Sequence, residues 1–368
     1  MASKSIPTIG TLATGISYLG MPFTNAICMR WPQHQRLLCI TGFAICVVSL
    51  IAASFATATW QLLLSQGALY GAGWVICYTP FLFMLNEWFV EKRGLAYGIL
   101  FAASGVSGLI IPLAVGAIMD RFGFRTALRV FAVATLIIGG PGLFMIKPRT
   151  AYARSPGQGN EKLGHSTEVM AVLKSTHFLI FAAAIFLQGL GFFLPNVFLP
   201  SFASDLGLPS SAGSALLASI SISQVVGQIG LGHVSDKMNP YIPTSFASCV
   251  SGLAVLFLWA PAKGMVKLVP FALLWGLFSA SYSVLYTRVC SSLVEDADVS
   301  MTVYGIFSFE RGVANILEGP ISAFLLGDEV DVDTYALGKY QGVAWFTGVC
   351  MLLSSFAVVG MLQAIHRR

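Results

Sequence analysis

The chain has 368 residues, of which 56% are hydrophobic and only 10% are charged, and its formal net charge is +5. A soluble globular protein carries about 25% charged residues, so this composition excludes an ordinary soluble domain. The apolar runs are about 20 residues long, which is the length of a membrane-spanning helix rather than of the alternating strands of a β-barrel. We therefore expect an all-α, multi-pass protein of a lipid bilayer.

About eleven stretches are long and apolar enough to cross a bilayer as helices. Their expected bounds are residues 6–29, 37–57, 60–86, 95–119, 126–146, 177–203, 212–234, 242–261, 267–290, 302–326 and 342–364. The longest polar stretch, residues 147–175, contains Pro, Gly and Ser and predicts a flexible linker. It separates an N-terminal bundle of five spans, residues 1–146, from a C-terminal bundle of six, residues 176–368. Because five and six are unequal, we expect that a first span is missing from two six-span halves.

Lys and Arg are concentrated in alternate loops between the expected spans. These loops carry, among others, Lys92, Arg93, Arg288 and Arg367. The positive-inside rule places such loops in the cytoplasm, although the basic residues within 120–129 oppose this orientation. We therefore expect a protein of the plasma membrane with a cytoplasmic linker and a cytoplasmic C-terminus.

Small residues inside the expected spans predict close contacts between helices. Gly67 and Gly71 form a Gly-x-x-x-Gly pattern, and Gly98, Ser104 and Gly105 follow in a later span. Such residues let two helix backbones approach each other. Four residues predict either a kink or a break in the span at 177–203, namely Gly189, Gly191, Pro195 and Pro200.

A charged segment begins the expected span at residues 95–119. Lys92 and Arg93 stand at this helix start, and Asp236 follows the expected span at 212–234. We predict a gate in which the two cations pair with Asp236, or with nearby glutamates, in one state and release it in another. The alternative is that both cations only anchor the helix end at the membrane surface.

Polar side chains in the middle of the back-half spans are candidates for substrate binding. They are Asn196, Gln224, Gln228 and Tyr282. Each alone is more often a hydrogen bond between two helices. Together they predict a pocket for a molecule that is larger and less charged than lactate.

The expected span at residues 302–326 has charges well inside it, at Glu310, Arg311 and Glu318. Arg311 lies about nine residues into the span, roughly 14 Å along a helix and near the middle of a bilayer. A charge there costs at least ~2.5 kcal/mol, so it must face protein or water rather than lipid. Steps of three and four place six polar residues on one helix face: Tyr304, Ser308, Arg311, Asn315, Glu318 and Ser322.

We expect this face to line a substrate pathway. Arg311 and Asn315 are predicted to bind the substrate, with Arg311 holding a carboxylate through a two-pronged contact. The alternative for Arg311 is a fixed ion pair. Glu318 is predicted to carry a proton, because a carboxyl kept away from water holds its proton more readily. Its alternative role is a hydrogen bond between helices.

Residues 86–98, Asn-Glu-Trp-Phe-Val-Glu-Lys-Arg-Gly-Leu-Ala-Tyr-Gly, resemble the signature of the monocarboxylate-porter branch of the major facilitator superfamily. The segments Arg30-Trp31-Pro32, 227–236 and 308–322 are similar to fungal members of that branch. The resemblance implies a two-bundle fold and alternating access. It also implies that the chain carries a small organic anion or related metabolite, often with a proton.

The sequence departs from this family pattern at three places. The first helix of the family is absent, Gln224 and Gln228 replace an Asp and an Arg of animal members, and the acidic residue of the first hairpin motif is not evident. These departures weaken the expectation of simple lactate–proton symport. An unusual substrate and a non-transporting fragment both stay open.

Enzyme signatures are not found in the sequence, which lacks the H-E-x-x-H, G-x-x-x-x-G-K-[ST] and G-x-S-x-G patterns. We expect no enzyme, no cofactor, no metal site and no nucleic-acid partner. The leading hypothesis is a secondary active transporter of a small organic acid or related metabolite that works by alternating access, with coupling to protons left open. The alternatives are an efflux transporter for a biosynthetic metabolite and a truncated membrane protein that does not transport.

Overall fold

The computed structural model describes residues 6–89, 91–146, 168–294, 296–327, 330–331 and 333–366. Their regular structure is helical, and one isolated bridge joins Val330 to Gly338. The predicted all-α class is therefore confirmed. Most of the predicted linker, residues 147–167, lies outside the described residues.

Contacts divide the chain into two compact units. Unit 1 comprises Met1–Val90, Ile111–Met170 and Asp296–Val313, and unit 2 comprises Glu91–Ile110, Ala171–Glu295 and Ala314–Arg368. Two long helices, α6 (Arg93–Met145) and α14 (Ala297–Leu325), contribute a part to each unit.

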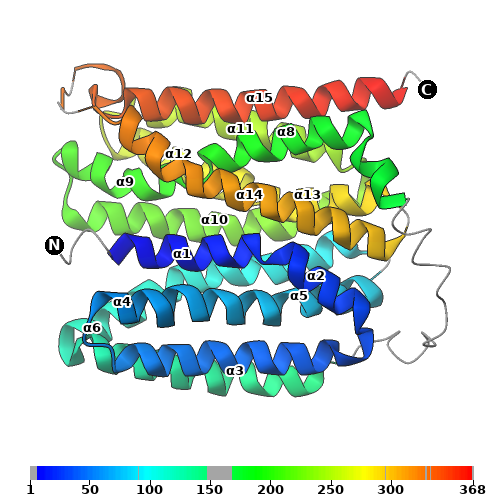
Figure 1. Cartoon of the computed structure of the whole chain (residues 1–368). Helices are drawn as coiled ribbons and strands as arrows, with labels where there is room; N and C mark the ends of the chain where they lie inside the picture. Colours follow the sequence, from blue (N-terminus) through cyan, green and yellow to red (C-terminus); the bar gives the residue numbers. More distant parts are fainter. Residues whose placement is uncertain are drawn as a thin grey trace. The chain divides into compact units, whose positions relative to one another are not determined.

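Unit 1 is built mainly from helices of the first part of the chain (Figure 1). Besides the parts of α6 and α14, it contains α1 (Ile6–Leu19), α2 (Met21–Arg30), η2 (Pro32–His34), α3 (Gln35–Ser54), α4 (Thr59–Leu62), η3 (Leu63–Leu69) and α5 (Tyr70–Trp88). α3 and α5 pack along each other, and α1 packs against η3 and α5.

Glycines allow α1 to lie directly on η3 and α5. An added Cβ at Gly71 would lie 2.6 Å from the carbonyl oxygen of Ala13, and one at Gly67 would lie 2.9 Å from the side chain of Leu12. The Ala13 backbone leaves no room for a side chain at Gly71, so a larger residue there would push the helices apart. The close packing predicted from the Gly-x-x-x-Gly pattern is confirmed.

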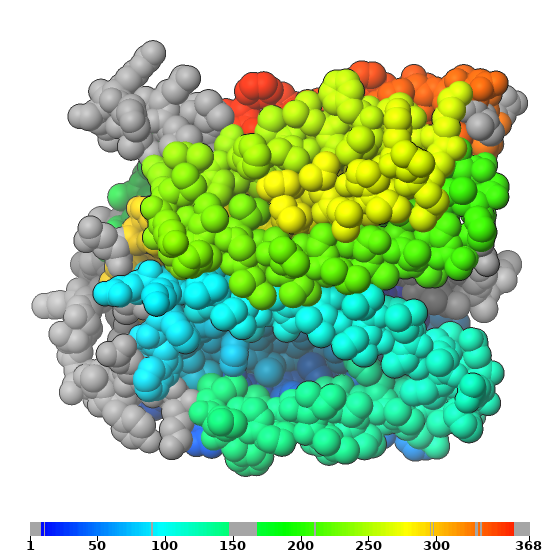
Figure 2. Space-filling view, turned by 180° about the vertical axis from the view of Figure 1, so that it is seen from behind, coloured from blue at the N-terminus to red at the C-terminus, as the bar shows by residue number. Residues whose placement is uncertain are grey.

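α6 is one helical segment of 53 residues with a break at Gly123, where φ is 79° and ψ is 166°. Glycine adopts a positive φ at no steric cost, so the chain can turn there. The parts before and after Gly123 correspond to the expected spans at 95–119 and 126–146. The second part (teal) lies at the surface in Figure 2, and its Ile137 and Ile138 are exposed, as suits side chains that face lipid.

Unit 2 contains most of the back half of the chain. Its further elements are α8 (Thr176–Gly191), α9 (Leu194–Asp205), α10 (Ser210–Lys237), α11 (Tyr241–Ala254), η4 (Val255–Trp259), α12 (Met265–Leu274), η5 (Trp275–Ser279), α13 (Tyr282–Leu293), η6 (Tyr335–Leu337) and α15 (Gln341–His366). α15 runs beside α8 and α11 (Figure 1).

The predicted irregularity in the span at 177–203 is an interruption of the helix. α8 ends at Gly191 and α9 begins at Leu194, so Phe192 and Phe193 separate the two helices. Pro195 stands in the first turn of α9, where its missing N–H has no partner to lose. Both separating residues keep helical dihedral angles, so the chain continues in the same general direction.

Seven helical segments of the described residues are long and apolar enough to cross a membrane. They are Pro32–Ser54, Thr59–Trp88, Arg93–Met145, Thr176–Asp205, Ser211–Lys237, Tyr241–Trp259 and Met265–Leu293. They cover eight of the eleven expected spans, because Arg93–Met145 accounts for two. The other three expected spans fall on α1 with α2, on α14 and on α15.

A small polar network ties the end of α9 to the segment before α15. Asp205 accepts hydrogen bonds from Lys339 Nζ at 2.9 Å and from the Tyr340 hydroxyl at 2.6 Å. Burial, followed by the hydrogen bond to Asp205 and its negative charge, raises the pKa of Tyr340 well above its usual value. The phenol therefore stays a donor at physiological pH.

We expect Asp205→Asn to lower the midpoint of thermal unfolding of the purified protein, because hydrogen bonds to a charged group contribute about 1.5–3 kcal/mol. The matched control is Asp333→Asn, which loses an ion pair to Lys263 whose two side chains are 94% and 63% exposed. Exposed pairs contribute little, so the control should leave the midpoint unchanged. Equal midpoints for the two variants would contradict a stabilising role of Asp205.

Candidate functional site

The polar face predicted on the 302–326 span is the buried face of α14. Its buried members are Tyr304, Ser308, Arg311, Glu318 and Ser322, and Asn315 is half-buried. The other face carries exposed apolar side chains, namely Phe309, Ile316, Leu317 and Phe324. This amphipathic arrangement keeps the charges of the helix away from lipid.

Arg311 lies in the part of α14 that belongs to unit 1, and it is 1% exposed. The next residue packs against α1, because an added Cβ at Gly312 would lie 2.6 Å from the Cβ of Tyr18. The carbonyl oxygen of Met301, ten residues before Arg311 on α14, accepts a hydrogen bond from Asn25 Nδ2 of α2 at 2.6 Å. The first part of α14 therefore lies against polar side chains of α1 and α2.

Asn315 and Glu318 lie in the part of α14 that belongs to unit 2. Glu318 is 4% exposed and interacts electrostatically with Cys350 of α15. One turn earlier, Ala314 packs against Leu190 of α8 and against Cys350. Both amide atoms of Asn315 are buried with no hydrogen-bond partner among the described residues. The Glu318 carboxyl thus lies near α15 inside unit 2.

Gln224 and Gln228 both lie on α10 and make contacts with neighbouring helical segments. Gln224 Nε2 donates to Ser104 Oγ of α6 at 2.8 Å, and Gln228 Nε2 donates to the carbonyl oxygen of Ala280 at 3.3 Å. The other amide atom of Gln228, Oε1, is buried with no hydrogen-bond partner among the described residues.

Asn196 and Tyr282 lie on other helices of unit 2. Asn196 Nδ2 donates back to the carbonyl oxygen of Phe192, one turn earlier, at 3.5 Å. Tyr282 on α13 is buried, and its ring centre lies 6.4 Å from that of Tyr286. The structure therefore gives Asn196 a local contact rather than one with the glutamines of α10.

The carboxylate of Asp236, at the end of α10, caps the first turn of α6. Its two oxygens accept the N–H groups of Gly94 and Leu95 at 2.7 and 2.8 Å, and Nε of Arg288 on α13 lies 3.4 Å away. A negative charge is stabilised at a helix N-terminus, and its hydrogen bonds there are charge-assisted. We call this arrangement of four residues the Asp236 latch.

The latch lies at the helix start that carries the two predicted gate cations. Lys92 is exposed and Arg93 is half-buried. Close contact is possible here because an added Cβ at Gly94 would overlap the backbone of Gly232, and one at Gly98 would overlap that of Gln228. The close packing predicted at Gly98 is confirmed.

A family model of the Major Facilitator Superfamily matches residues 2–317 of the chain. The chain belongs to the Major Facilitator Superfamily. Its membership shows a multi-pass membrane transporter of the secondary type, which works in a lipid bilayer on a small-molecule substrate.

Relatives of this Major Facilitator protein occur in fungi and animals. It is 28% identical over 317 residues to the MFS transporter asaE of Aspergillus flavus, covering 86% of this chain and 69% of the relative. It is 26% identical over 361 residues to the MFS-type transporter 1 of an Ophiocordyceps species, covering 97% and 76%. It is 27% identical over 350 residues to the monocarboxylate transporter 12-B of Danio rerio, covering 87% and 71%. The predicted resemblance to the monocarboxylate-porter branch is confirmed.

A solved structure supports the fold of this Major Facilitator protein. The crystal structure of the Escherichia coli fucose:proton symporter FucP matches it with a TM-score of 0.72, covering 98% of this chain and 92% of that chain. The sequences are 12% identical, so the likeness shows the fold alone. The predicted major facilitator-type fold is confirmed.

Arg288 is a residue of the latch that sequence reasoning grouped only with the basic loops. It lies on α13 six residues after the buried Tyr282, and it is largely buried itself. Its position before the end of the expected span at 267–290, rather than in the loop after it, was the signal that could have identified it, because a cation within a span is favoured by an acidic partner. In this Major Facilitator protein that partner is Asp236.

Proposed function

We propose that this protein carries a small organic acid or a related metabolite across the plasma membrane by alternating access. Arg311 is the observation that supports this proposal most directly. It is a permanent cation, 1% exposed, at the middle of a helix of 29 residues. A guanidinium can hold a carboxylate through two parallel charge-assisted hydrogen bonds, and these are strong where water is excluded.

The rest of the substrate would meet uncharged polar groups. We assign this role to Asn315, Asn196, Gln224, Gln228 and Tyr282. Asn315 and Gln228 support the assignment, since each has a buried amide atom with no hydrogen-bond partner among the described residues. Leaving such an atom without a partner costs about 1–3 kcal/mol, which a bound substrate could recover.

We further propose that the bundles at residues 1–146 and 176–368, joined by a cytoplasmic linker at 147–175, move against each other during transport. The Asp236 latch, together with Lys92 and Arg93, would close the pathway on the cytoplasmic side, where the C-terminus also lies. The latch supports this idea because it links α6, from the first half of the sequence, to α10 and α13 from the second. Such a contact can form in one state and break in another.

A transport assay tests the proposal. The purified protein is reconstituted into vesicles with an imposed pH gradient, and a panel of carboxylates and their uncharged amides is offered on either side. We expect saturable movement of at least one carboxylate, driven by the proton gradient, and no movement of its amide. Failure of every carboxylate to move in either direction would overturn the proposal.

Glu318→Gln is expected to flatten the pH dependence of transport, because glutamine cannot take up or release a proton at the position proposed to couple protons. Rates are measured in the same vesicles from acidic to alkaline pH, with and without a gradient. The matched control is Asp333→Asn, which changes an exposed carboxylate in the segment after α14. An unchanged pH profile in Glu318→Gln would assign this carboxyl to helix packing.

A further inference from the structure

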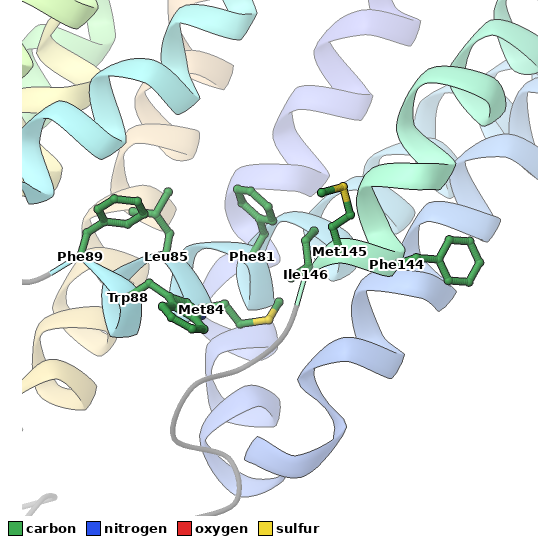
Figure 3. A pocket seen from close by; sticks show the side chains of 8 residues that line it. All are labelled: Phe81, Met84, Leu85, Trp88, Phe89, Phe144, Met145 and Ile146. Atoms are coloured by element: carbon green, nitrogen blue, oxygen red, sulfur yellow. The ribbon is translucent and has the colours of Figure 1, made fainter.

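An apolar cleft of about 590 Å³ lies at one end of unit 1. Eight residues line it, namely Phe81, Met84, Leu85, Trp88, Phe89, Phe144, Met145 and Ile146. Figure 3 shows that they come from the end of α5 and the end of α6, with Trp88 beside Met84 and with Phe144 pointing away from the others. All eight side chains are apolar or aromatic, so the cleft suits a hydrocarbon ligand.

The cleft continues an apolar face of α5. Steps of four and three residues place Trp74, Tyr78, Phe81, Leu85 and Trp88 on one side of this helix. The rings of Trp74 and Tyr78 stack with their centres 4.3 Å apart. The face is roughly 21 Å long at 1.5 Å per residue, somewhat more than the ~15 Å depth of the hydrocarbon in one membrane leaflet. An extended acyl chain running along the helix therefore fits better than a compact molecule.

A cation stands at the edge of the cleft. Arg36, in the first turn of α3, donates Nη2 to the carbonyl oxygen of Phe144 at 3.3 Å. Its Nε is buried with no hydrogen-bond partner among the described residues. A guanidinium that still has donors to offer, beside an apolar cleft, matches the phosphate of an amphiphile whose tail fills the cleft.

The cleft lies where helices of unit 1 begin and end. α3 begins at Gln35, α5 ends at Trp88 and α6 ends at Met145. Trp88 and Met145 are 54% and 83% exposed, although both are large and apolar. Exposed tryptophan at the end of a membrane-spanning helix is typical of the level of the lipid headgroups. Arg36 would thus lie at the depth of the lipid headgroup, and the apolar cleft would lie at the depth of the acyl chain.

We propose that this cleft binds one acyl chain of an anionic phospholipid, whose phosphate is held by Arg36. The site depends on the membrane-spanning fold and not on the transported substrate. A bound lipid would cover the apolar ends of α5 and α6 and connect them to the start of α3.

Fluorescence quenching by lipids with brominated acyl chains tests the site. The full chain is placed in phosphatidylcholine vesicles that contain a small fraction of either brominated phosphatidylglycerol or brominated phosphatidylcholine. The difference between the unchanged protein and Trp88→Phe isolates Trp88 from the other six tryptophans. We expect the anionic lipid to quench Trp88 at roughly a tenth of the fraction that phosphatidylcholine needs, because the choline cation of phosphatidylcholine offsets the phosphate charge that Arg36 would meet, and a tenfold preference corresponds to about 1.4 kcal/mol.

Arg36→Gln should remove this tenfold preference, and Arg36→Lys should retain part of it. The matched control is Arg125→Gln in unit 1, which loses a similar contact from Nη2 to the carbonyl oxygen of Ala56; its preference should be unchanged. Ile146→Phe, which fills part of the cleft without adding a tryptophan, should lower quenching by both lipids.

Three outcomes would overturn the proposal. Equal quenching by the two lipids in the unchanged protein would mean that Trp88 meets only bulk bilayer. Protection from both lipids, together with a dimer on crosslinking, would assign the cleft to a second copy of the chain. If free fatty acid displaces the anionic lipid when it is present at a lower concentration than that lipid, the cleft would be assigned to a carboxylate amphiphile.

Discussion

Arg311→Gln is expected to lower the apparent affinity for carboxylates so far that uptake at low substrate concentration is lost, while the protein still inserts into the membrane. Glutamine keeps a polar side chain, but it is two bonds shorter and has neither the positive charge nor the planar fork that would hold a carboxylate. A hydrogen bond to a charged group is worth about 1.5–3 kcal/mol, so apparent affinity should fall roughly 10- to 150-fold. The measurement is the initial rate of uptake into vesicles over a range of substrate concentrations.

A matched control separates this effect from a general loss of positive charge. Arg121→Gln changes an exposed arginine of α6 and should leave uptake unchanged. Equal elution profiles and thermal midpoints would show that both variants fold. Normal carboxylate uptake by a folded Arg311→Gln protein would remove Arg311 from the substrate site.

Asp236→Asn is expected to weaken the latch between α10 and α6. The variant can still offer an oxygen to one backbone N–H, but it leaves the largely buried Arg288 without a negative partner. Losing such a partner costs about 1–3 kcal/mol, so the equilibrium between latched and open states should shift roughly 5- to 150-fold toward the open one. Hydrogen–deuterium exchange at the first turn of α6 should rise, and the transport rate should change with it.

The structure offers a matched control for this latch at the start of α14. There Asp296 caps its own helix, with Oδ1 accepting the N–H groups of Asp298 and Val299 at 2.8 and 3.0 Å. Asparagine is as good as aspartate at such a local cap, so Asp296→Asn should leave exchange in α6 unchanged. If the two variants raise exchange at α6 equally, Asp236 has no special role as a latch.

The two caps differ in how far along the chain the acidic residue lies from the helix that it caps. The structure satisfies the first N–H groups of α14 locally through Asp296, whereas Gly94 and Leu95 depend on a residue more than 140 positions away. Loss of the long-range cap, and not of the local one, is therefore expected to separate α10 from the first turn of α6.

The substrate candidates differ in how far residue spacing could place them. Tyr304, Ser308, Arg311 and Glu318 follow helical steps, and a bilayer forces such a face inward, so burial followed from local periodicity alone. The surroundings of each residue did not follow. Arg311 lies near α1 in unit 1, while Glu318 lies near α15 in unit 2.

The amino-acid sequence by itself determined the helical class, the approximate spans, the family and the buried face of α14, because each of these depends on hydropathy or on short-range spacing. Only the tertiary structure decided which cation meets Asp236, which helix each glutamine of α10 contacts and where an apolar cleft stays open. These features depend on side chains that are distant along the chain, and their meeting is set by how glycines and bulky residues let whole helices approach each other.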